Sequence, residues 1–304
     1  MKEKGVMSRN SVITNISIAD MVIEVQGHCS VLDLPLDGVL DRFLGVSPKP
    51  VRRLFMEWQR SDEELQPEGE LVYDPGAVWR MYASNDSWCA EITYALDHRA
   101  TMSKEVNCLL YANPEWDAFR LVERNITQAD GDMFFLGACE LIVRTSIVMV
   151  GGLMLHASPL DDNGRGIAFC GPSGMGKSTQ LRLWEGEKGV LAMSDDRVVV
   201  GSDENGRKVC YGTPWGSKPE IALNASAPLN ALVILEQSSA NGITELSSPT
   251  AATRVTCRAF LPFWDKGLMK MAFKNLNEIV NNVPVYLLRF REEPSVVDIV
   301  RSVL

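Results

Sequence analysis

The residues that most directly suggest chemistry are 171–179, which read G-P-S-G-M-G-K-S-T. They fit the pattern G-x-x-x-x-G-K-[ST] of a phosphate-binding P-loop. Glycine lets such a loop wrap closely around phosphates, so that backbone N–H groups point at the phosphate oxygens. The segment predicts a nucleotide site in which Lys177 reaches the β- and γ-phosphates and the Ser178 hydroxyl ligates magnesium. The residues expected to contact the nucleotide are Gly171, Ser173, Gly174, Met175, Gly176, Lys177, Ser178 and Thr179.

The segments that flank this loop are of the kinds that a P-loop requires. The apolar run GIAFC at 166–170 predicts a strand before the loop, and STQLRLWE at 178–185 predicts a helix after it. A helix that begins at Lys177 also directs its N-terminal dipole at the same anion. The context therefore favours a true phosphate-binding loop over a chance match to the pattern.

Asp195 and Asp196 form the second candidate element, directly after the apolar run 190–194. Asp195 follows Lys177 by only 18 positions. That distance fits a short helix, a turn at 186–189 and one strand back alongside the P-loop strand. We therefore expect both carboxylates beside the phosphates, one to serve the metal and the other to accept a hydroxyl proton. The spacing does not assign the two roles, and the competing interpretation is a solvated acidic turn.

His156 is the third candidate. If the turn DDNGR at 161–165 centres on Asn163, positions 156 and 170 face each other across a hairpin, because both lie seven residues from Asn163. His156 then lies beside the start of the phosphate loop and can contact the metal or the γ-phosphate. Taken alone, a histidine in such a run is more often a buried structural residue.

The three elements in this order, LHAS, G-x-S-G-x-G-K-S-T and S-D-D-R, resemble the catalytic domain of HPr kinase/phosphorylase and its relatives. That family shares its fold with the ATP-dependent phosphoenolpyruvate carboxykinases. The resemblance covers about residues 150–240. It implies that His156, Lys177, Ser178, Asp195 and Asp196 gather around ATP and Mg²⁺. The metal ligands that it implies are Ser178, Asp196 and His156.

Two later segments, YGTPWGSK at 211–218 and APLNALVILEQ at 227–237, resemble a subgroup related to HPr kinase. Some members of that subgroup are associated with peptide natural products and phosphorylate a precursor peptide. The first segment replaces the phosphorylase signature of true HPr kinases, so the resemblance implies neither HPr as substrate nor the reverse reaction. Trp215 and Lys218 are candidates for substrate contact, although a turn with Trp215 over the core is slightly favoured.

The elements around these motifs predict two domains, 1–130 and 131–304. Strands interleaved with helices after residue 130 indicate an α/β domain, with strands expected at 190–193, 198–200, 231–235 and 285–288 and helices at 177–185, 249–261, 267–281 and 295–303. A helix over about 133–149, capped by Asp130 or Asp132, precedes the first strand of that domain. The first domain is β-rich, with a hairpin that turns at Asn85-Asp86 and a helical segment at 37–60. The fold class is thus α/β in the second domain and α+β overall, and the resemblance implies a P-loop kinase domain of the HPr kinase type.

Composition limits the partners. The 304 residues carry a net charge of -9 with a pI near 5.0, which argues against nucleic-acid binding. Glu140 and Arg144 interrupt the most apolar stretch, 133–155, which argues against a membrane span. Seven scattered cysteines and the lack of a signal peptide point to the cytoplasm.

These observations favour an ATP-dependent kinase that phosphorylates a hydroxyl, with serine of a peptide or protein as the expected acceptor. A small-molecule kinase stays open, because nothing in the sequence identifies the acceptor. A non-catalytic ATP-binding regulatory protein, whose β-rich domain recognises a partner, also stays open, as does homo-oligomerisation. Carboxykinase activity is disfavoured, because the larger domain and the additional basic residues that a carboxylate substrate needs are not found.

Overall fold

The computed structural model describes residues 12–27, 38–76, 79–92, 106–124 and 128–304. Its contacts divide the chain into two compact units, Met1–Ile142 and Val143–Leu304. The division falls inside a helix, α1 (Gln128–Met149). The sequence-based boundary near residue 130 stays a prediction, because a division by contacts does not show that the parts fold separately. The described residues form a mixed α/β protein with two large sheets and five α-helices.

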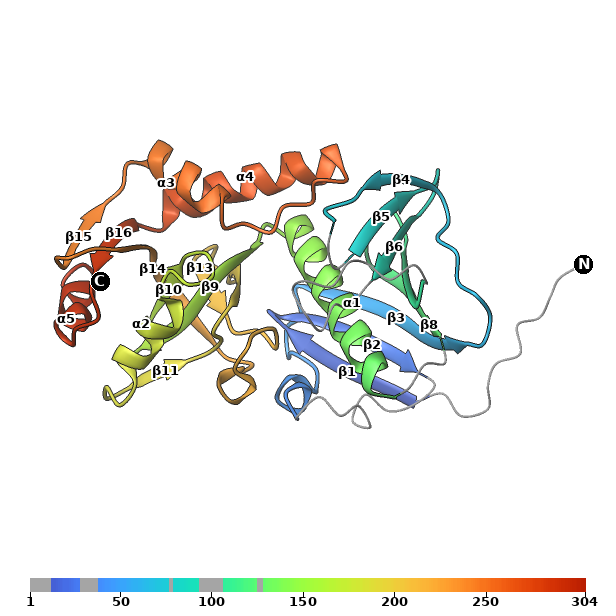
Figure 1. Ribbon diagram of the computed structural model, residues 1–304, viewed down its shortest axis with the longest axis horizontal. Coiled ribbons are helices and arrows are strands. Elements are labelled where there is room, and N and C mark those ends of the chain that lie inside the picture. The colour runs from blue at the N-terminus through green and yellow to red at the C-terminus, as the bar shows by residue number, and fades with distance from the viewer. Residues whose placement is uncertain (1–11, 28–37, 77–78, 93–105, 125–127) are drawn as a thin grey trace, which may run out of the picture. The chain divides into compact units, whose positions relative to one another are not determined.

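The N-terminal unit is built on one eight-stranded sheet (Figure 1). Its strands follow the order β1-β2-β3-β8-β7-β6-β5-β4, in which β3 pairs in parallel with both β2 and β8. The other pairs are antiparallel. The strands are β1 (Val12–Ile18), β2 (Met21–Gly27), β3 (Arg52–Ser61), β4 (Glu70–Tyr73), β5 (Trp79–Ala83), β6 (Trp88–Ile92), β7 (Cys108–Ala112) and β8 (Ala118–Arg124). The prediction of a β-rich first half is confirmed.

Within this unit one local prediction is confirmed and another is wrong. Strands β5 and β6 form the expected hairpin around Asn85-Asp86, with Ala83 paired to Trp88. Residue 37 lies outside the described residues; over 38–60 the segment is not helical beyond a short 3-10 turn (Leu40–Phe43), and most of its second half is β3. Leu54 and Trp58, four residues apart, suggested a helix, but in β3 buried and exposed residues alternate. A spacing of four satisfies a two-residue period as well as a helical one.

Helix α1 confirms the predicted end of a helix but not its start. It ends at Met149, and Gly151 follows with φ 87°. It begins at Gln128, so Asp130 and Asp132 lie within its first turns and not at its N-cap position. In the N-terminal unit, Phe135 of this helix packs on Trp58, with ring centroids 4.8 Å apart.

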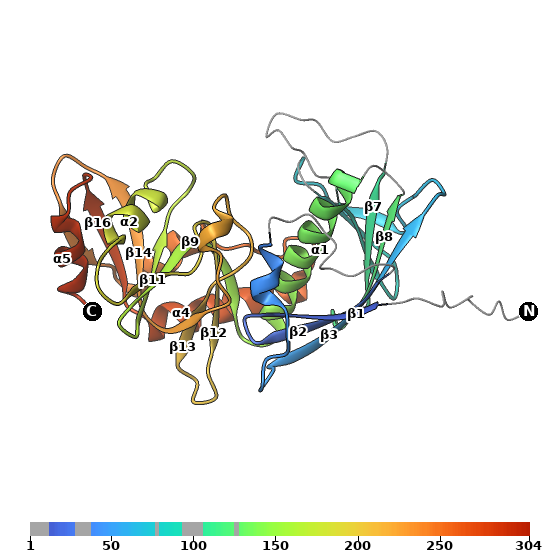
Figure 2. The ribbon, with the colours of Figure 1, turned by 90° about the horizontal axis from the view of Figure 1, so that it is seen from below.

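The C-terminal unit holds the second large sheet (Figure 2). Its order is β10-β9-β12-β13-β14-β16-β15, and a further parallel pairing of β10 with β14 closes the first five strands into a ring. The strands are β9 (Leu153–Asp162), β10 (Arg165–Cys170), β11 (Val190–Ala192), β12 (Arg197–Ser202), β13 (Lys208–Tyr211), β14 (Ser226–Gln237), β15 (Gly242–Glu245) and β16 (Val285–Phe290). The helices are α2 (Lys177–Trp184), α3 (Ser248–Thr256), α4 (Lys266–Asn282) and α5 (Ser295–Arg301). The predicted helices and the predicted strands of the β12, β14 and β16 regions are therefore confirmed.

Two helical layers cover the parallel strands β10, β14 and β16 on opposite faces (Figures 1 and 2). Ala168 and Cys170 of β10 pack in a cluster with α3 and α4, whereas Ile167 and Phe169 pack in a cluster with α2 and α5. Alternate residues of β10 thus pack into two separate hydrophobic cores, one on each face of the sheet. This explains the nearly continuous apolar runs, which are typical of strands buried on both faces.

Two details of the predicted strand arrangement are wrong. In the β9–β10 hairpin Cys170 pairs with Ala157, not with His156. The reason is a two-residue turn in which Asn163 (φ 54°) and Gly164 (φ 86°) both have positive φ, as in a type I′ turn, so the hairpin centres between them. In addition, the strand that precedes the aspartate pair, β11, pairs with β9 and not with the P-loop strand β10.

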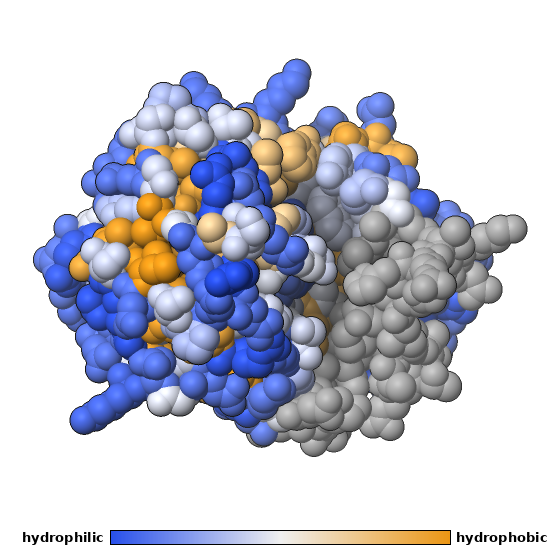
Figure 3. Space-filling view, turned by 60° about the vertical axis from the view of Figure 1, so that its left-hand side comes forward, coloured by the Kyte–Doolittle hydropathy of each residue, from blue (hydrophilic) through white to orange (hydrophobic). Residues whose placement is uncertain are grey.

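No helix among the described residues is long and apolar enough to cross a membrane. On the face drawn in Figure 3, hydrophilic residues surround patches of hydrophobic ones. The six cysteines of the described ranges are free thiols, and all except Cys257 are buried.

Candidate functional site

The predicted phosphate loop connects β10 to α2, as the motif requires. Gly174 and Gly176 have φ angles of 79° and 104°, a region that residues with a side chain rarely adopt. At Gly176 a Cβ would also lie 2.6 Å from the ring of Phe290. The backbone N–H groups at the start of α2 have no partners within the helix, so they are available to an anion.

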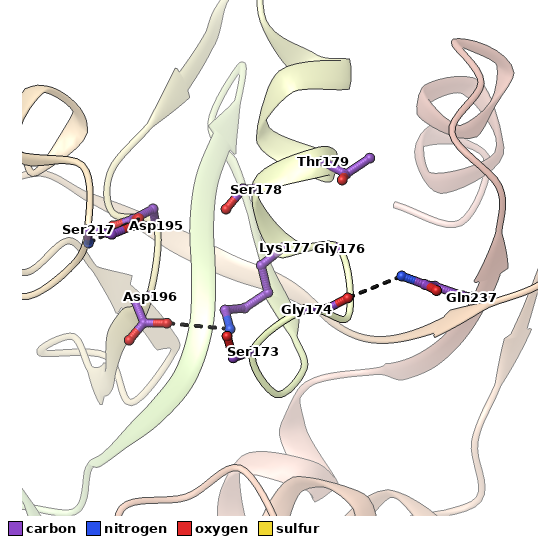
Figure 4. Close-up of a pocket in the computed structure, with 10 residues that line it drawn as sticks. All are labelled: Ser173, Gly174, Gly176, Lys177, Ser178, Thr179, Asp195, Asp196, Ser217 and Gln237. Atoms are coloured by element: carbon purple, nitrogen blue, oxygen red, sulfur yellow. Dashed lines mark hydrogen bonds and ion pairs between the residues drawn. The ribbon is translucent and has the colours of Figure 1, made fainter. Parts of the chain in front are cut away.

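Lys177 is nearly buried, with 7% of the side chain exposed. Its Nζ donates to the carbonyl oxygen of Gly171 at 2.9 Å and lies 2.8 Å from Nε2 of His156 and 3.4 Å from Oδ1 of Asp196. Burial lowers the pKa of Lys177 below its ordinary value, while the charge of Asp196 opposes that shift. The ammonium group is therefore desolvated and lies among these three groups, and Figure 4 shows its ion pair with Asp196.

Asp196 is the electrostatic centre of the site. Its Oδ1 lies 2.6 Å from Nε2 of His156, and its Oδ2 accepts from the Arg197 guanidinium at 2.5 Å. Burial would raise the pKa of Asp196, but the hydrogen bond with His156 and the charges of Arg197, His156 and Lys177 together hold it at about 2. This carboxylate consequently is ionised at neutral pH.

His156 links Lys177 to Asp196 through a single ring nitrogen. Nε2 can accept a hydrogen bond from Lys177 only when it carries no proton, and it can donate to Asp196 only when it does. The two contacts therefore cannot both be hydrogen bonds of the same tautomer of His156. The wrong hairpin register did not remove His156 from the site, because His156 pairs with Arg197 on β12, the residue that follows Asp196.

Asp195 faces a different set of groups. Its side chain is 4% exposed, which excludes the solvated acidic turn that competed with the functional interpretation. Its Oδ2 accepts from the backbone N–H of Ser217 at 3.2 Å and from the Ser217 hydroxyl at 2.5 Å. A Cβ on Gly216 would lie 1.9 Å from its Oδ1. The segment 213–218 thus closes directly over this carboxylate.

These groups line one cavity of about 260 Å³ (Figure 4). Its lining residues are Ser173, Gly174, Gly176, Lys177, Ser178, Thr179, Asp195, Asp196, Ser217 and Gln237. Two of the residues expected to contact the nucleotide do not line it. Gly171 accepts from Lys177 at the start of the loop, and Met175 packs against the core shared with α2 and α5.

Sequence reasoning missed two lining residues. Gln237 ends β14, and its Nε2 donates to the carbonyl oxygen of Gly174 at 3.1 Å. Its place at the end of an apolar run was the available signal, since strand ends position functional side chains. Ser217 lies between the two candidates for substrate contact, Trp215 and Lys218. Neither of these lines the cavity, and Trp215 is 6% exposed, which fits a structural role.

In the part of the chain that the structure describes, no three His, Cys, Asp or Glu side chains gather as a metal site. The predicted ligands Ser178, Asp196 and His156 include only two residues of those types. Mg²⁺ is commonly held by one or two carboxylates, with the remaining ligands supplied by substrate phosphates and water. The hydroxyl of Ser178 and the carboxylate of Asp196 line the same cavity and are of the kinds that such a site uses.

Comparisons with known proteins place the chain in a family. No curated protein matches it. Among solved structures, an HPr(Ser) kinase/phosphatase from Coxiella burnetii matches with 12% identity over 49% of this chain and 94% of that chain. The TM-score of this match is 0.29. The family model described as SynChlorMet cassette protein ScmC matches residues 124–293, more than half of the chain, including the P-loop, the aspartate pair and the segment over Asp195. The chain therefore belongs to the ScmC family of SynChlorMet cassette proteins.

Proposed function

We propose that this chain is an ATP-dependent kinase that transfers the γ-phosphoryl group to a hydroxyl, namely serine of a peptide or protein. One observation carries the proposal. A P-loop with a buried lysine lines a single cavity together with two aspartates, and a histidine contacts both that lysine and one of the aspartates. A loop that only binds nucleotide needs the lysine and the backbone donors, but it does not need two carboxylates opposite them.

The residues of the loop fit the phosphates of a nucleotide. Gly174 and Gly176 leave the cavity side of the loop without side chains, so phosphate oxygens can approach the backbone donors. The desolvated ammonium group of Lys177 gains a partner when an anion enters, which offsets the cost of its burial. The Ser178 hydroxyl and the Asp196 carboxylate would hold Mg²⁺, which when bound neutralises phosphate charge and orients the γ-phosphoryl group.

The two carboxylates suit different roles. Since the pKa of Asp196 is held at about 2, it is a weak base and suits a constant negative charge beside the metal. Asp195 already accepts a hydrogen bond from a hydroxyl group, that of Ser217. We assign Asp195 as the acceptor of the proton from the attacking hydroxyl. His156 acts as a positioning residue, because it contacts Lys177 and Asp196 but does not itself line the cavity.

An edge strand of the N-terminal unit supports the choice of a peptide or protein as the acceptor. Strand β4 pairs with β5 alone among the described strands, and its Leu71 and Val72 are 48% and 42% exposed. An exposed edge with apolar side chains can bind an extended peptide by adding it as a strand. A small-molecule acceptor would need no such surface.

The direct test incubates the full chain with labelled ATP, Mg²⁺ and a panel of serine-containing peptides and small alcohols. We expect label on a peptide serine, and we expect Lys177→Ala to abolish the transfer. A matched control is Lys188→Ala, because Lys188 is exposed in the turn after α2. Label on a small alcohol alone would replace this proposal with a small-molecule kinase. ATP binding without any turnover would favour a regulatory protein.

A further inference from the structure

The hydroxyl of Ser217 occupies the place where an acceptor hydroxyl would meet Asp195 (Figure 4). Ser217 is exposed and lines the same cavity as Lys177 and Ser178. Its Oγ donates to Oδ2 of Asp195 at 2.5 Å, within the range of a charge-assisted O–H···O⁻ hydrogen bond. A serine hydroxyl bonded to a carboxylate base is the arrangement that activates a hydroxyl as a nucleophile.

The segment that carries Ser217 is fixed from both sides. Trp215 is buried, and the Thr213 hydroxyl donates to the carbonyl oxygen of Arg197 at 2.9 Å. The backbone of Gly216 lies so close to Asp195 that a Cβ there would be 1.9 Å from Oδ1. The contact of Ser217 with Asp195 is therefore built into the packing of the segment rather than made by a side chain on a loose loop.

The other hydroxyl groups of the cavity lack this arrangement. Ser173, Ser178 and Thr179 also line it. Across the residues that the structure describes, none of these three hydroxyls has a carboxylate partner, whereas Ser217 has one. Among the cavity's own hydroxyls, Ser217 is therefore the best placed to act as an acceptor.

We propose that Ser217 is a site of self-phosphorylation within one chain, an inference that rests on the proposed kinase function. Oγ of Ser217 forms a bond to the γ-phosphorus of ATP as the bond from that phosphorus to the β,γ-bridging oxygen breaks. ADP leaves with the electron pair of the broken bond. The hydroxyl proton passes to Oδ2 of Asp195. The products are phosphoserine at 217 and ADP.

The modification would limit the activity of the same site. Phosphoserine brings a charge of about −1.5 to −2 at neutral pH, here directly beside the carboxylate of Asp195. That repulsion opposes the binding of a second ATP and displaces the serine from the base. An acceptor peptide has to displace Ser217 from Asp195 in order to react, so a good acceptor slows the self-phosphorylation.

The test incubates the full chain with labelled ATP and Mg²⁺ without any acceptor and maps the label by mass spectrometry. We expect up to one phosphate per chain at Ser217, formed with a rate constant that does not depend on protein concentration. Ser217→Ala should lose the label completely, and Ser217→Thr should carry it as phosphothreonine. The matched control is Ser302→Ala, which removes an exposed serine outside the cavity and should retain the label.

The outcomes separate this inference from the proposed function. Transfer to a peptide, or steady release of ADP, with Ser217 unmodified would overturn the inference and leave the kinase in place. Label on another residue, such as Ser173, would also overturn it, as would a rate constant proportional to protein concentration, because one chain would then modify another. A chain that neither turns over ATP nor becomes labelled would contradict both the self-phosphorylation of Ser217 and the proposed kinase function.

Discussion

The substitution Gly216→Ala tests the geometry of the site most directly. A Cβ at this position would lie 1.9 Å from Oδ1 of Asp195, whereas real Cβ contacts essentially never fall below 3.0 Å. The carboxylate or the backbone of the segment must therefore move by about 1 Å. Asp195 cannot turn away freely, because it is 4% exposed and accepts two hydrogen bonds from Ser217.

The expected result is a loss of turnover with the nucleotide affinity retained. A displacement of about 1 Å at a reacting group can lower a rate by about a hundredfold, which corresponds to about 2.7 kcal/mol in the activation free energy. The P-loop is untouched, so ATP binding measured by calorimetry should stay within about twofold, or about 0.4 kcal/mol. Alanine at position 216 causes no backbone strain, because the φ of Gly216 lies outside the left-handed region.

The assay compares kcat for ADP formation or peptide phosphorylation in Gly216→Ala and in a control, Gly242→Ala. Gly242 lies in β15, and a Cβ there would meet nothing within 4 Å. Thermal unfolding of both variants shows that each is folded. Full kcat in Gly216→Ala would refute the reasoning, since Asp195 would then be either unmoved or unimportant. A parallel loss of ATP affinity would refute it as well.

The remaining predictions concern the charged groups. Lys177→Ala should abolish turnover, and it should weaken ATP binding in calorimetry by at least tenfold, or about 1.4 kcal/mol, because a buried charge-assisted contact is lost. The control variant Lys188→Ala should bind ATP with the affinity of the wild type. Asp195→Asn should lower kcat with the Mg²⁺ requirement unchanged, whereas Asp196→Asn should raise the Mg²⁺ concentration needed for half-maximal rate. Equal behaviour of the two variants in a magnesium titration would contradict the assignment of Asp195 to the proton and Asp196 to the metal. Because the folded-state pKa of Asp196 is lowered from 3.8 to about 2, its ionisation stabilises the fold fully above pH 3.8, and the contribution disappears as the pH falls through about 2. Denaturant unfolding should show this as a gap of about 2 kcal/mol between the wild type and Asp196→Asn at pH 5 that closes toward pH 2, and a gap independent of pH would disprove it.

The conformation of the predicted phosphate loop could be anticipated from the sequence because its requirements are local. Gly174 and Gly176 adopt φ angles that glycine permits, and the flanking runs form β10 and α2 as expected. The helices of the C-terminal unit were predictable for a similar reason, because the apolar residues of each helix recur with a period of 3.6 residues within its own segment.

Predictions failed where two interpretations share one local pattern. The spacing of Leu54 and Trp58 fits a helix and a strand equally, and only pairing with β2 and β8 decides for the strand. The register of the β9–β10 hairpin depended on whether one or two residues form the turn. The positive φ angles of Asn163 and Gly164 show a two-residue turn. The partner of β11 depends on the closure of the sheet, which no local pattern encodes.

The sequence by itself predicted that a lysine, a hydroxyl and two carboxylates would meet at the predicted phosphate loop, because the motif and the short distance from Lys177 to Asp195 bring them together, although β11 returns beside β9 and not beside β10. Only the tertiary structure decided how the two aspartates differ. Asp196 faces His156, Lys177 and Arg197, whereas Asp195 faces Ser217, a residue 22 positions away along the chain. Adjacent residues leave a backbone in different directions, so each takes its electrostatic environment from whatever elements pack against it. Those elements come together only when the sheet closes.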